Sequence, residues 1–244
     1  MTTRVATWSG PRNISTAMMR AWENRPDTAV VDEPFYAAYL ARTDGPRGDH
    51  PARDAVIASQ PTDPAAVVAG LLAPLPEGAQ VQYVKHMTHH LLPADDLSWL
   101  GGFRNVLLIR RPDEVVASYL RSRDTCEPED IGILQQVRLL DTLEAAGERP
   151  PTVDAADFLR DPESYLRWLC DWLGIGFTDR MLSWPAGPRD SDGVWAPHWY
   201  DAVWASTGFE PYRPRNVQLD ADGEAVAEAC RPAYERLHAA RLIL

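Results

Sequence analysis

Residues 4–20 limit what this chain can fold into more than any other stretch. A short β-rich run at 4–8 leads through a Gly-Pro turn at 10–11 and two hydroxyl residues into good helix formers. This order predicts a strand, an anion-binding loop and the start of a helix. The unpaired N–H groups and the positive dipole end of a helix start favour a phosphate group. The candidate binding residues of this loop are Gly10, Pro11, Arg12, Asn13, Ile14, Ser15 and Thr16.

The loop departs from the phosphate-binding pattern of ATP and GTP enzymes. Ser15-Thr16 follows Gly10 where Gly-Lys-Ser or Gly-Lys-Thr would stand, and Arg12 is the only cation within the loop. An ordinary ATP or GTP site is therefore disfavoured. A capped helix after a buried strand, with Arg12 at the surface, is the purely structural alternative.

The later segments complete an α/β pattern. Strand-like runs occur at 28–32, 80–85, 105–109 and 152–154, and helical patterns at 64–72, 130–146, 161–174 and 220–242. A length of 244 residues with 45% hydrophobic composition suits one domain with a proper core. We expect a single three-layer domain over residues 1–244, with a central, mainly parallel sheet of about five strands flanked by helices.

Two segments show no regular helical or strand periodicity of their hydrophobic residues. Residues 42–64 are rich in Pro, Gly, Asp and Arg, which predicts a mobile excursion that closes over a ligand as a lid. Residues 184–216 carry aromatic side chains among Pro, Gly and Asp. These aromatics either line a ligand pocket or pack a long loop, and both interpretations stay open.

Ionisable residues follow two of the predicted strands. Glu33 comes after the run at 28–32, and Lys85 ends the run at 80–85 and is followed by His86. Ligands collect at the carboxyl ends of parallel strands, so Glu33 is expected beside the loop at 10–16. A turn-capping role for Glu33 and a surface position for Lys85 are the alternatives. The histidines at 86, 89 and 90 lack a nearby carboxylate or cysteine, so no metal site is expected.

The loop at 10–16 resembles the 5'-phosphosulfate-binding loop of the sulfotransferases that use 3'-phosphoadenosine 5'-phosphosulfate (PAPS). In that family an Arg ending an apolar strand and a Ser eight residues later hold the 3'-phosphate, and Arg110 and Ser118 have this separation. A basic segment late in the chain closes over the same phosphate, which implies Arg213 and Arg215 as further donors. Solvent-facing charge is the alternative for these two arginines.

The resemblance also implies catalytic roles. In the heparan-type enzymes a Glu after the second strand removes the acceptor proton, and Glu33 with the following Pro-Phe-Tyr resembles that segment. Cytosolic members have a Lys, one intervening residue and a catalytic His, whereas here His86 comes one residue early and Met87 holds the expected position. This departure favours Glu33 over His86 as the base. Arg12 would stabilise charge on the departing phosphate, and Lys85 would stabilise the acceptor side or the transferring sulfonate.

The function implied by the resemblance is sulfonate transfer. The donor would be PAPS, the acceptor a hydroxyl or amine of a small molecule, and the product adenosine 3',5'-bisphosphate, with no metal required. A small-molecule kinase, in which Asp32 holds magnesium, and a non-catalytic nucleotide-binding protein stay open as alternatives. The sequence predicts neither the acceptor nor the oligomeric state.

Charge and cysteine content set further limits. The formal charge of −11, from 24 Lys+Arg against 35 Asp+Glu, repels nucleic acid and anionic membranes, so an anionic donor needs locally concentrated cations. Cys126, Cys170 and Cys230 are odd in number and widely spaced, which indicates neither a disulfide framework nor a zinc site. No leader and no apolar stretch of membrane-spanning length is evident, so a cytoplasmic protein is expected.

Overall fold

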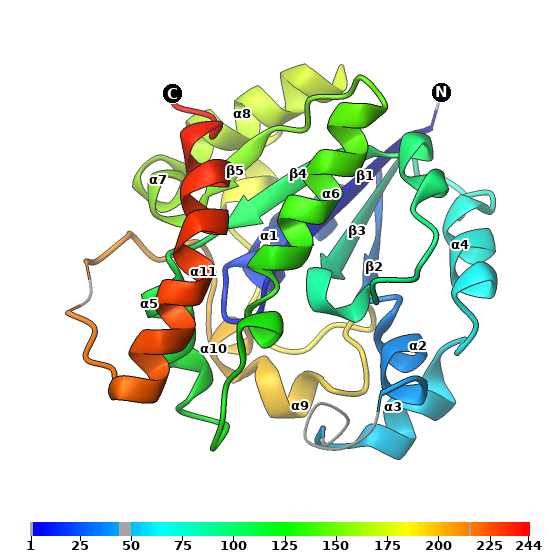
Figure 1. Cartoon of the computed structure of the whole chain (residues 1–244). Helices are drawn as coiled ribbons and strands as arrows, with labels where there is room; N and C mark the ends of the chain where they lie inside the picture. The colour runs from blue at the N-terminus through cyan, green and yellow to red at the C-terminus, as the bar shows by residue number, and fades with distance from the viewer. Residues whose placement is uncertain (1, 44–49, 215) are drawn as a thin grey trace.

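The computed structural model describes residues 2–43, 50–214 and 216–244, and at its centre lies a five-stranded sheet (Figure 1). The strands are β1 (Thr3–Ser9), β2 (Thr28–Asp32), β3 (Val81–Met87), β4 (Arg104–Ile109) and β5 (Thr152–Asp154). They lie in the order β2-β3-β1-β4-β5, and every pairing is parallel. The predicted α/β domain with a parallel central sheet is confirmed.

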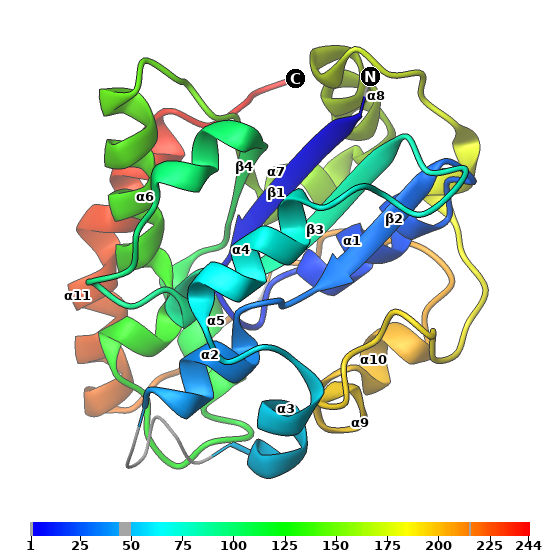
Figure 2. The ribbon, with the colours of Figure 1, turned by 90° about the vertical axis from the view of Figure 1, so that its right-hand side faces the viewer.

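Helices cover both faces of the sheet, as buried parallel strands require (Figures 1 and 2). On one face, side chains such as Ala6 and Leu107 pack with α4 (Pro64–Leu72), α5 (Pro112–Tyr119), α6 (Ile133–Ala145) and α11 (Ala221–Ala239). On the other face, their strand neighbours Val5 and Val106 pack with α1 (Ser15–Glu23), α7 (Ala155–Arg160) and α8 (Pro162–Leu173). Successive strand residues point to opposite faces, so the nearly continuous apolar runs serve two cores.

A third group of helices lies beyond the carboxyl ends of the strands (Figure 2). It comprises α2 (Tyr36–Ala41), α3 (Arg53–Ser59), α9 (Ala196–Trp199) and α10 (Asp201–Trp204). Its core includes Tyr36, Leu40, Val56 and Trp195, each at most 2% exposed. The predicted excursion at 42–64 thus contains α3, while its residues 44–49 lie outside the described part of the chain.

Local sequence signals account for several helix boundaries. The Asp161 carboxylate accepts a hydrogen bond from the backbone N–H of Ser164 at 3.1 Å, and Gly174 ends α8 with φ at 72°. The helix predicted from residue 130 begins instead at Ile133, because a 3-10 turn (Pro128–Ile131) and left-handed Gly132 precede it. Caps and breakers therefore set these ends locally.

Within the described residues, no single helix is long and apolar enough to cross a bilayer. Helices α3 and α4 have the required length and apolar composition only when taken together, and they are bent by 51° relative to each other.

Candidate active site

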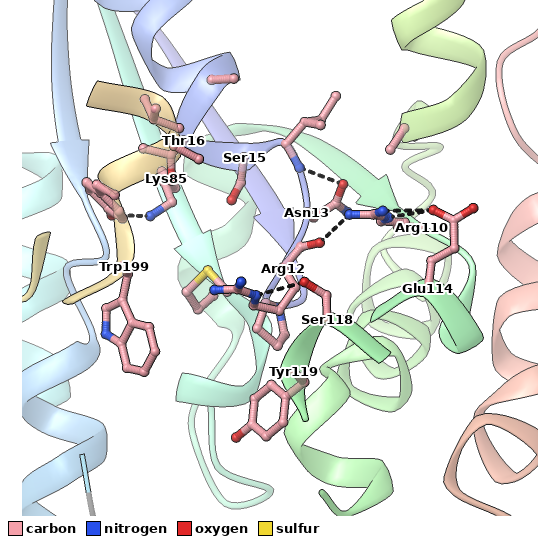
Figure 3. A pocket seen from close by; sticks show the side chains of 18 of the residues that line it. Arg12, Asn13, Ser15, Thr16, Lys85, Arg110, Glu114, Ser118, Tyr119 and Trp199 are labelled. Carbon is pink, nitrogen blue, oxygen red and sulfur yellow. Dashed lines mark hydrogen bonds and ion pairs between the residues drawn. The ribbon is translucent and has the colours of Figure 1, made fainter. Parts of the chain in front are cut away.

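A cavity of about 620 Å³ opens at the carboxyl ends of the strands, where parallel α/β sheets bind their ligands (Figure 3). Its size lies within the usual range for small-molecule sites. The β1–α1 loop (residues 10–14) and the ends of β3 and β4 contribute side chains to its lining, as do Glu33 and the segment 199–213. Residues from strands far apart in the sequence therefore meet in one place.

The β1–α1 loop is fixed by contacts to its neighbours. A Cβ on Gly10 would lie 2.1 Å from the carbonyl oxygen of Ile131, so a glycine is required for this close approach. Asn13 donates from Nδ2 to the carbonyl of Leu108 at 3.1 Å and accepts from the N–H of Ile14 at 2.8 Å. Gly10 itself does not line the cavity, whereas all the other predicted loop residues do. The loop amides and the start of α1 are thus held at the cavity wall.

Ser118 joins two guanidinium groups at one side of the cavity. Its Oγ accepts hydrogen bonds from Nε of Arg12 at 3.0 Å and from Nη2 of Arg121 at 2.8 Å, and Arg110 donates to the carbonyl of Arg12 at 2.7 Å (Figure 3). Burial, followed by the positive charges of Arg121 and Arg110, lowers the pKa of Arg12. An anion placed among these cations would relieve their mutual repulsion. Arg12, Arg110 and Ser118, predicted from distant motifs, are therefore in one cluster.

Glu114 is a member of this cluster that the sequence reasoning missed. Its buried carboxylate accepts from Nε and Nη2 of Arg110 at 3.0 and 2.8 Å and from the hydroxyl of Tyr212 at 3.2 Å. The four-residue spacing from Arg110 was its only signal in the sequence. Arg213 also lines the cavity, whereas Arg215 lies outside the described residues.

Lys85 lies at the opposite side of the cavity in a buried ion-pair cluster. Its Nζ contacts Oδ1 of Asp32 at 2.9 Å, Oε1 of Glu33 at 2.5 Å and the hydroxyl of Tyr200 at 2.5 Å. The Tyr200 hydroxyl also lies 2.8 Å from Oδ2 of Asp32 and 3.3 Å from Oε1 of Glu33. The aromatic segment supplies Tyr200, and nothing in its local sequence indicated this partner.

The charges in this cluster shift one another's pKa. Burial raises the pKa of Glu33 against the opposing effect of Lys85, and the neighbouring Asp32 carboxylate raises it further. Burial alone would lower the pKa of Lys85, but Asp32 and Glu33 raise it. Lys85 is therefore held as the ammonium ion, while Glu33 is a stronger base than an exposed glutamate.

His86 is not part of the cavity. It follows Lys85 by one residue in β3, so its side chain points to the other face of the sheet. There its ring stacks on Trp8 with centroids 3.9 Å apart, and burial lowers its pKa to about 3. The one-residue displacement noted in the sequence therefore places His86 in the core, where it is 1% exposed.

Aromatic side chains form a further part of the lining. Figure 3 shows Tyr119 and Trp199 at the end of the cavity away from Ser15 and Thr16. Tyr36, His50, His89 and His90 line the cavity as well. Four side chains of the aromatic segment line the cavity: Trp199, Tyr200, Phe209 and Tyr212. Trp184 and Trp195 are instead buried in packing clusters. The segment therefore both lines the cavity and packs a long loop. No cluster of three His, Cys, Asp or Glu side chains suited to a metal ion occurs in the described part of the chain.

Three solved structures share this fold. The sulfotransferase domain of the Synechococcus PCC 7002 olefin synthase superposes with a TM-score of 0.54 at 18% identity, covering 93% of this chain and 94% of that one. The sulfotransferase domain of the curacin biosynthetic pathway has the same TM-score at 13% identity, over 95% and 98% of the two chains. A sulfotransferase from Alicyclobacillus acidocaldarius gives 0.54 at 15% identity, over 100% and 98%. At such identities the likeness shows the fold.

Sequence comparison extends the likeness to curated proteins and to a family. Branched-chain-amino-acid aminotransferase-like proteins 1 and 2 of Arabidopsis thaliana are 36% and 33% identical over 88% and 94% of this chain. The chain spans only 38% and 40% of their lengths. The family described as Sulfotransferase domain matches residues 3–241. With that match over nearly the whole chain and the fold of three sulfotransferase domains, this chain belongs to the sulfotransferase domain family.

Proposed function

We propose that this sulfotransferase moves a sulfonate group from PAPS to a hydroxyl or amine of a small-molecule acceptor and leaves adenosine 3',5'-bisphosphate. The observation that carries the proposal is one cavity with cations and loop amides on one side and a buried carboxylate on the other. The cation cluster suits a doubly phosphorylated nucleotide, and Glu33 suits an acceptor whose proton must be removed.

The donor side offers separate places for the two ends of such a nucleotide. The amides of the β1–α1 loop, the N-terminus of α1 and the hydroxyls of Ser15 and Thr16 would bind the 5' end. Arg110, Ser118 and Arg213 would bind the 3'-phosphate. A charge-assisted hydrogen bond contributes about 1.5–3 kcal/mol, so a few of them suffice to hold the donor in an acidic protein.

PAPS supplies a sulfonate on a phosphate leaving group, and the chain's own residues promote its transfer. Glu33 would accept the acceptor's proton, and its raised pKa brings its basicity closer to neutral pH. Arg12 belongs to the β1–α1 loop and lines the cavity, and from this loop it would stabilise charge that develops on the departing 5'-phosphate. The kinase alternative has less support, because both oxygens of Asp32 already accept hydrogen bonds within the protein.

Ligand-induced thermal stabilisation tests the donor. Adenosine 3',5'-bisphosphate without magnesium should stabilise the protein by about 2.7 kcal/mol at a hundredfold excess over Kd. Stabilisation only by magnesium-ATP would instead support phosphoryl transfer. Incubation with PAPS and a panel of hydroxyl and amine acceptors, followed by mass spectrometry, then tests turnover; binding without any transfer would favour a non-catalytic role.

A further inference from the structure

Every donor of Lys85 is used within the protein. An ammonium group has three N–H donors, and Nζ of Lys85 has three oxygen partners: Oδ1 of Asp32, Oε1 of Glu33 and the hydroxyl of Tyr200, all within 2.9 Å. The side chain is 1% exposed. A donated sulfonate would therefore find no unused N–H on Lys85 in this arrangement.

Tyr200 holds the cluster together from the aromatic segment. Its hydroxyl accepts from Lys85 and, at 3.2 Å, from Nε1 of Trp195, so its own hydrogen is directed to the carboxylates. Oδ1 and Oδ2 of Asp32 lie 2.9 and 2.8 Å away, closer than Oε1 of Glu33 at 3.3 Å. The N–H of Gly193 also donates to Oδ2 of Asp32 at 3.2 Å. Asp32 is thus fixed from several directions.

Glu33 has one anchored oxygen and one open oxygen. The contacts from Lys85 and Tyr200 both end on Oε1, and Oε2 has no hydrogen-bond partner among the described residues. The backbone of Glu33 adopts φ of 41°, and its N–H donates to the carbonyl of Lys85 at 2.9 Å. Such a left-handed conformation is costly for a non-glycine residue and persists where the surroundings impose it. Because Glu33 lines the cavity, Oε2 is the oxygen that an acceptor can reach.

We infer that Lys85 acts on the reaction through Glu33 and does not contact the sulfonate. Asp32 and Tyr200 are the positioning residues that hold Lys85 in this role. The inference rests on the proposed function. As the acceptor's oxygen or nitrogen bonds to sulfur, its O–H or N–H proton passes to Oε2 of Glu33, and the bond from sulfur to the donor's 5'-phosphate breaks with its electron pair on the phosphate. Glu33 is then neutral, and Asp32 still balances the charge of Lys85.

The mildest test is Tyr200→Phe, which removes one hydroxyl and keeps the ring. The hydrogen bond from Tyr200 stabilises the Glu33 carboxylate, so its loss should move the acid limb of the kcat–pH profile to higher pH. We expect kcat to fall about fivefold, the loss of one hydrogen bond of average strength, with Kd for adenosine 3',5'-bisphosphate within twofold. Tyr234→Phe is the matched control, because its hydroxyl also donates to a carboxylate, at 3.0 Å, but its partner Asp154 ends β5, at the opposite edge of the sheet from β2 and Glu33. If the acid limbs of the Tyr200→Phe and Tyr234→Phe variants lay at the same pH, the inference would be overturned.

A second comparison asks whether Lys85 touches the sulfonate. Lys85→Met alone leaves two buried carboxylates without a cation, so Asp32→Asn is combined with it to keep the fold. We expect this double variant to bind PAPS and adenosine 3',5'-bisphosphate with the same ratio of affinities as the unaltered protein. A selective loss of PAPS affinity would place Lys85 on the sulfonate and refute the inference. Failure of the unaltered protein to bind the bisphosphate would instead refute the proposed function.

Discussion

Arg110→Ala gives the sharpest test of the donor site. The Arg110 side chain is 17% exposed; its guanidinium forms two hydrogen bonds to Glu114 and one to the carbonyl of Arg12, and still has N–H groups for a ligand. One lost charge-assisted hydrogen bond to the 3'-phosphate costs about 1.5–3 kcal/mol. Because about 1.4 kcal/mol corresponds to tenfold, affinity for adenosine 3',5'-bisphosphate should fall roughly ten- to a hundredfold.

Glu114 complicates the single variant. Its side chain is 3% exposed, and without Arg110 its carboxylate becomes an unpaired buried charge, which typically costs about 3–5 kcal/mol of stability. The same charge would also repel the phosphate. Arg110→Ala combined with Glu114→Gln removes the charge and keeps an oxygen for the hydroxyl of Tyr212. This double variant should recover most of the stability while its affinity for the bisphosphate stays low.

Isothermal titration calorimetry with two ligands separates the effects. Adenosine 3',5'-bisphosphate and adenosine 5'-monophosphate differ only by the 3'-phosphate, so the double variant should lose affinity for the first and bind the second unchanged. The double variant keeps the net charge of the protein, and Arg167→Ala, on the exposed face of α8, is the charge control for the single variant Arg110→Ala. An equal loss for both nucleotides, or no loss for either, would refute the assignment of Arg110 to the 3'-phosphate.

Three further predictions concern the frame around the site. Gly10→Ala should destabilise the fold by about 1–3 kcal/mol through its backbone clash, whereas Gly70→Ala in helix α4, where a Cβ meets nothing within 4 Å, should stabilise by about 0.5–1 kcal/mol in urea unfolding. The pKa of His86 falls from 6.5 to about 3 on folding, so its contribution is present above pH 6.5 and is lost as pH decreases toward 3. His86→Phe should flatten the fall of Tm over that range; an unchanged slope contradicts the burial argument. Arg20→Met leaves Asp192 without its buried partner and should cost about 3–5 kcal/mol; a loss below about 1 kcal/mol would show that water replaces the pair.

Much of the fold is determined by signals within a few residues of one another. The strand, loop and helix formers at 4–20, the Asp161-Pro162 start and Gly174 end of α8, and the apolar run of β4 each follow from local backbone and side-chain preferences. Parallel strands then require helical crossovers, which restricts the topology. The loop residues, Arg110, Ser118 and Glu33 were accordingly found at the carboxyl edge of the sheet.

Only the tertiary structure decided which of these residues contact one another and which side chains connect them. Ser118 joins Arg12 across 106 positions, and Tyr200 reaches Asp32 across 168. No periodicity encodes such pairs, because strand order and the path of the aromatic segment bring them together. His86 shows the converse: it stands one position from Lys85, yet the two-residue period of a strand sends it to the opposite core. Chain proximity thus determined the elements, and packing across the sheet determined the site.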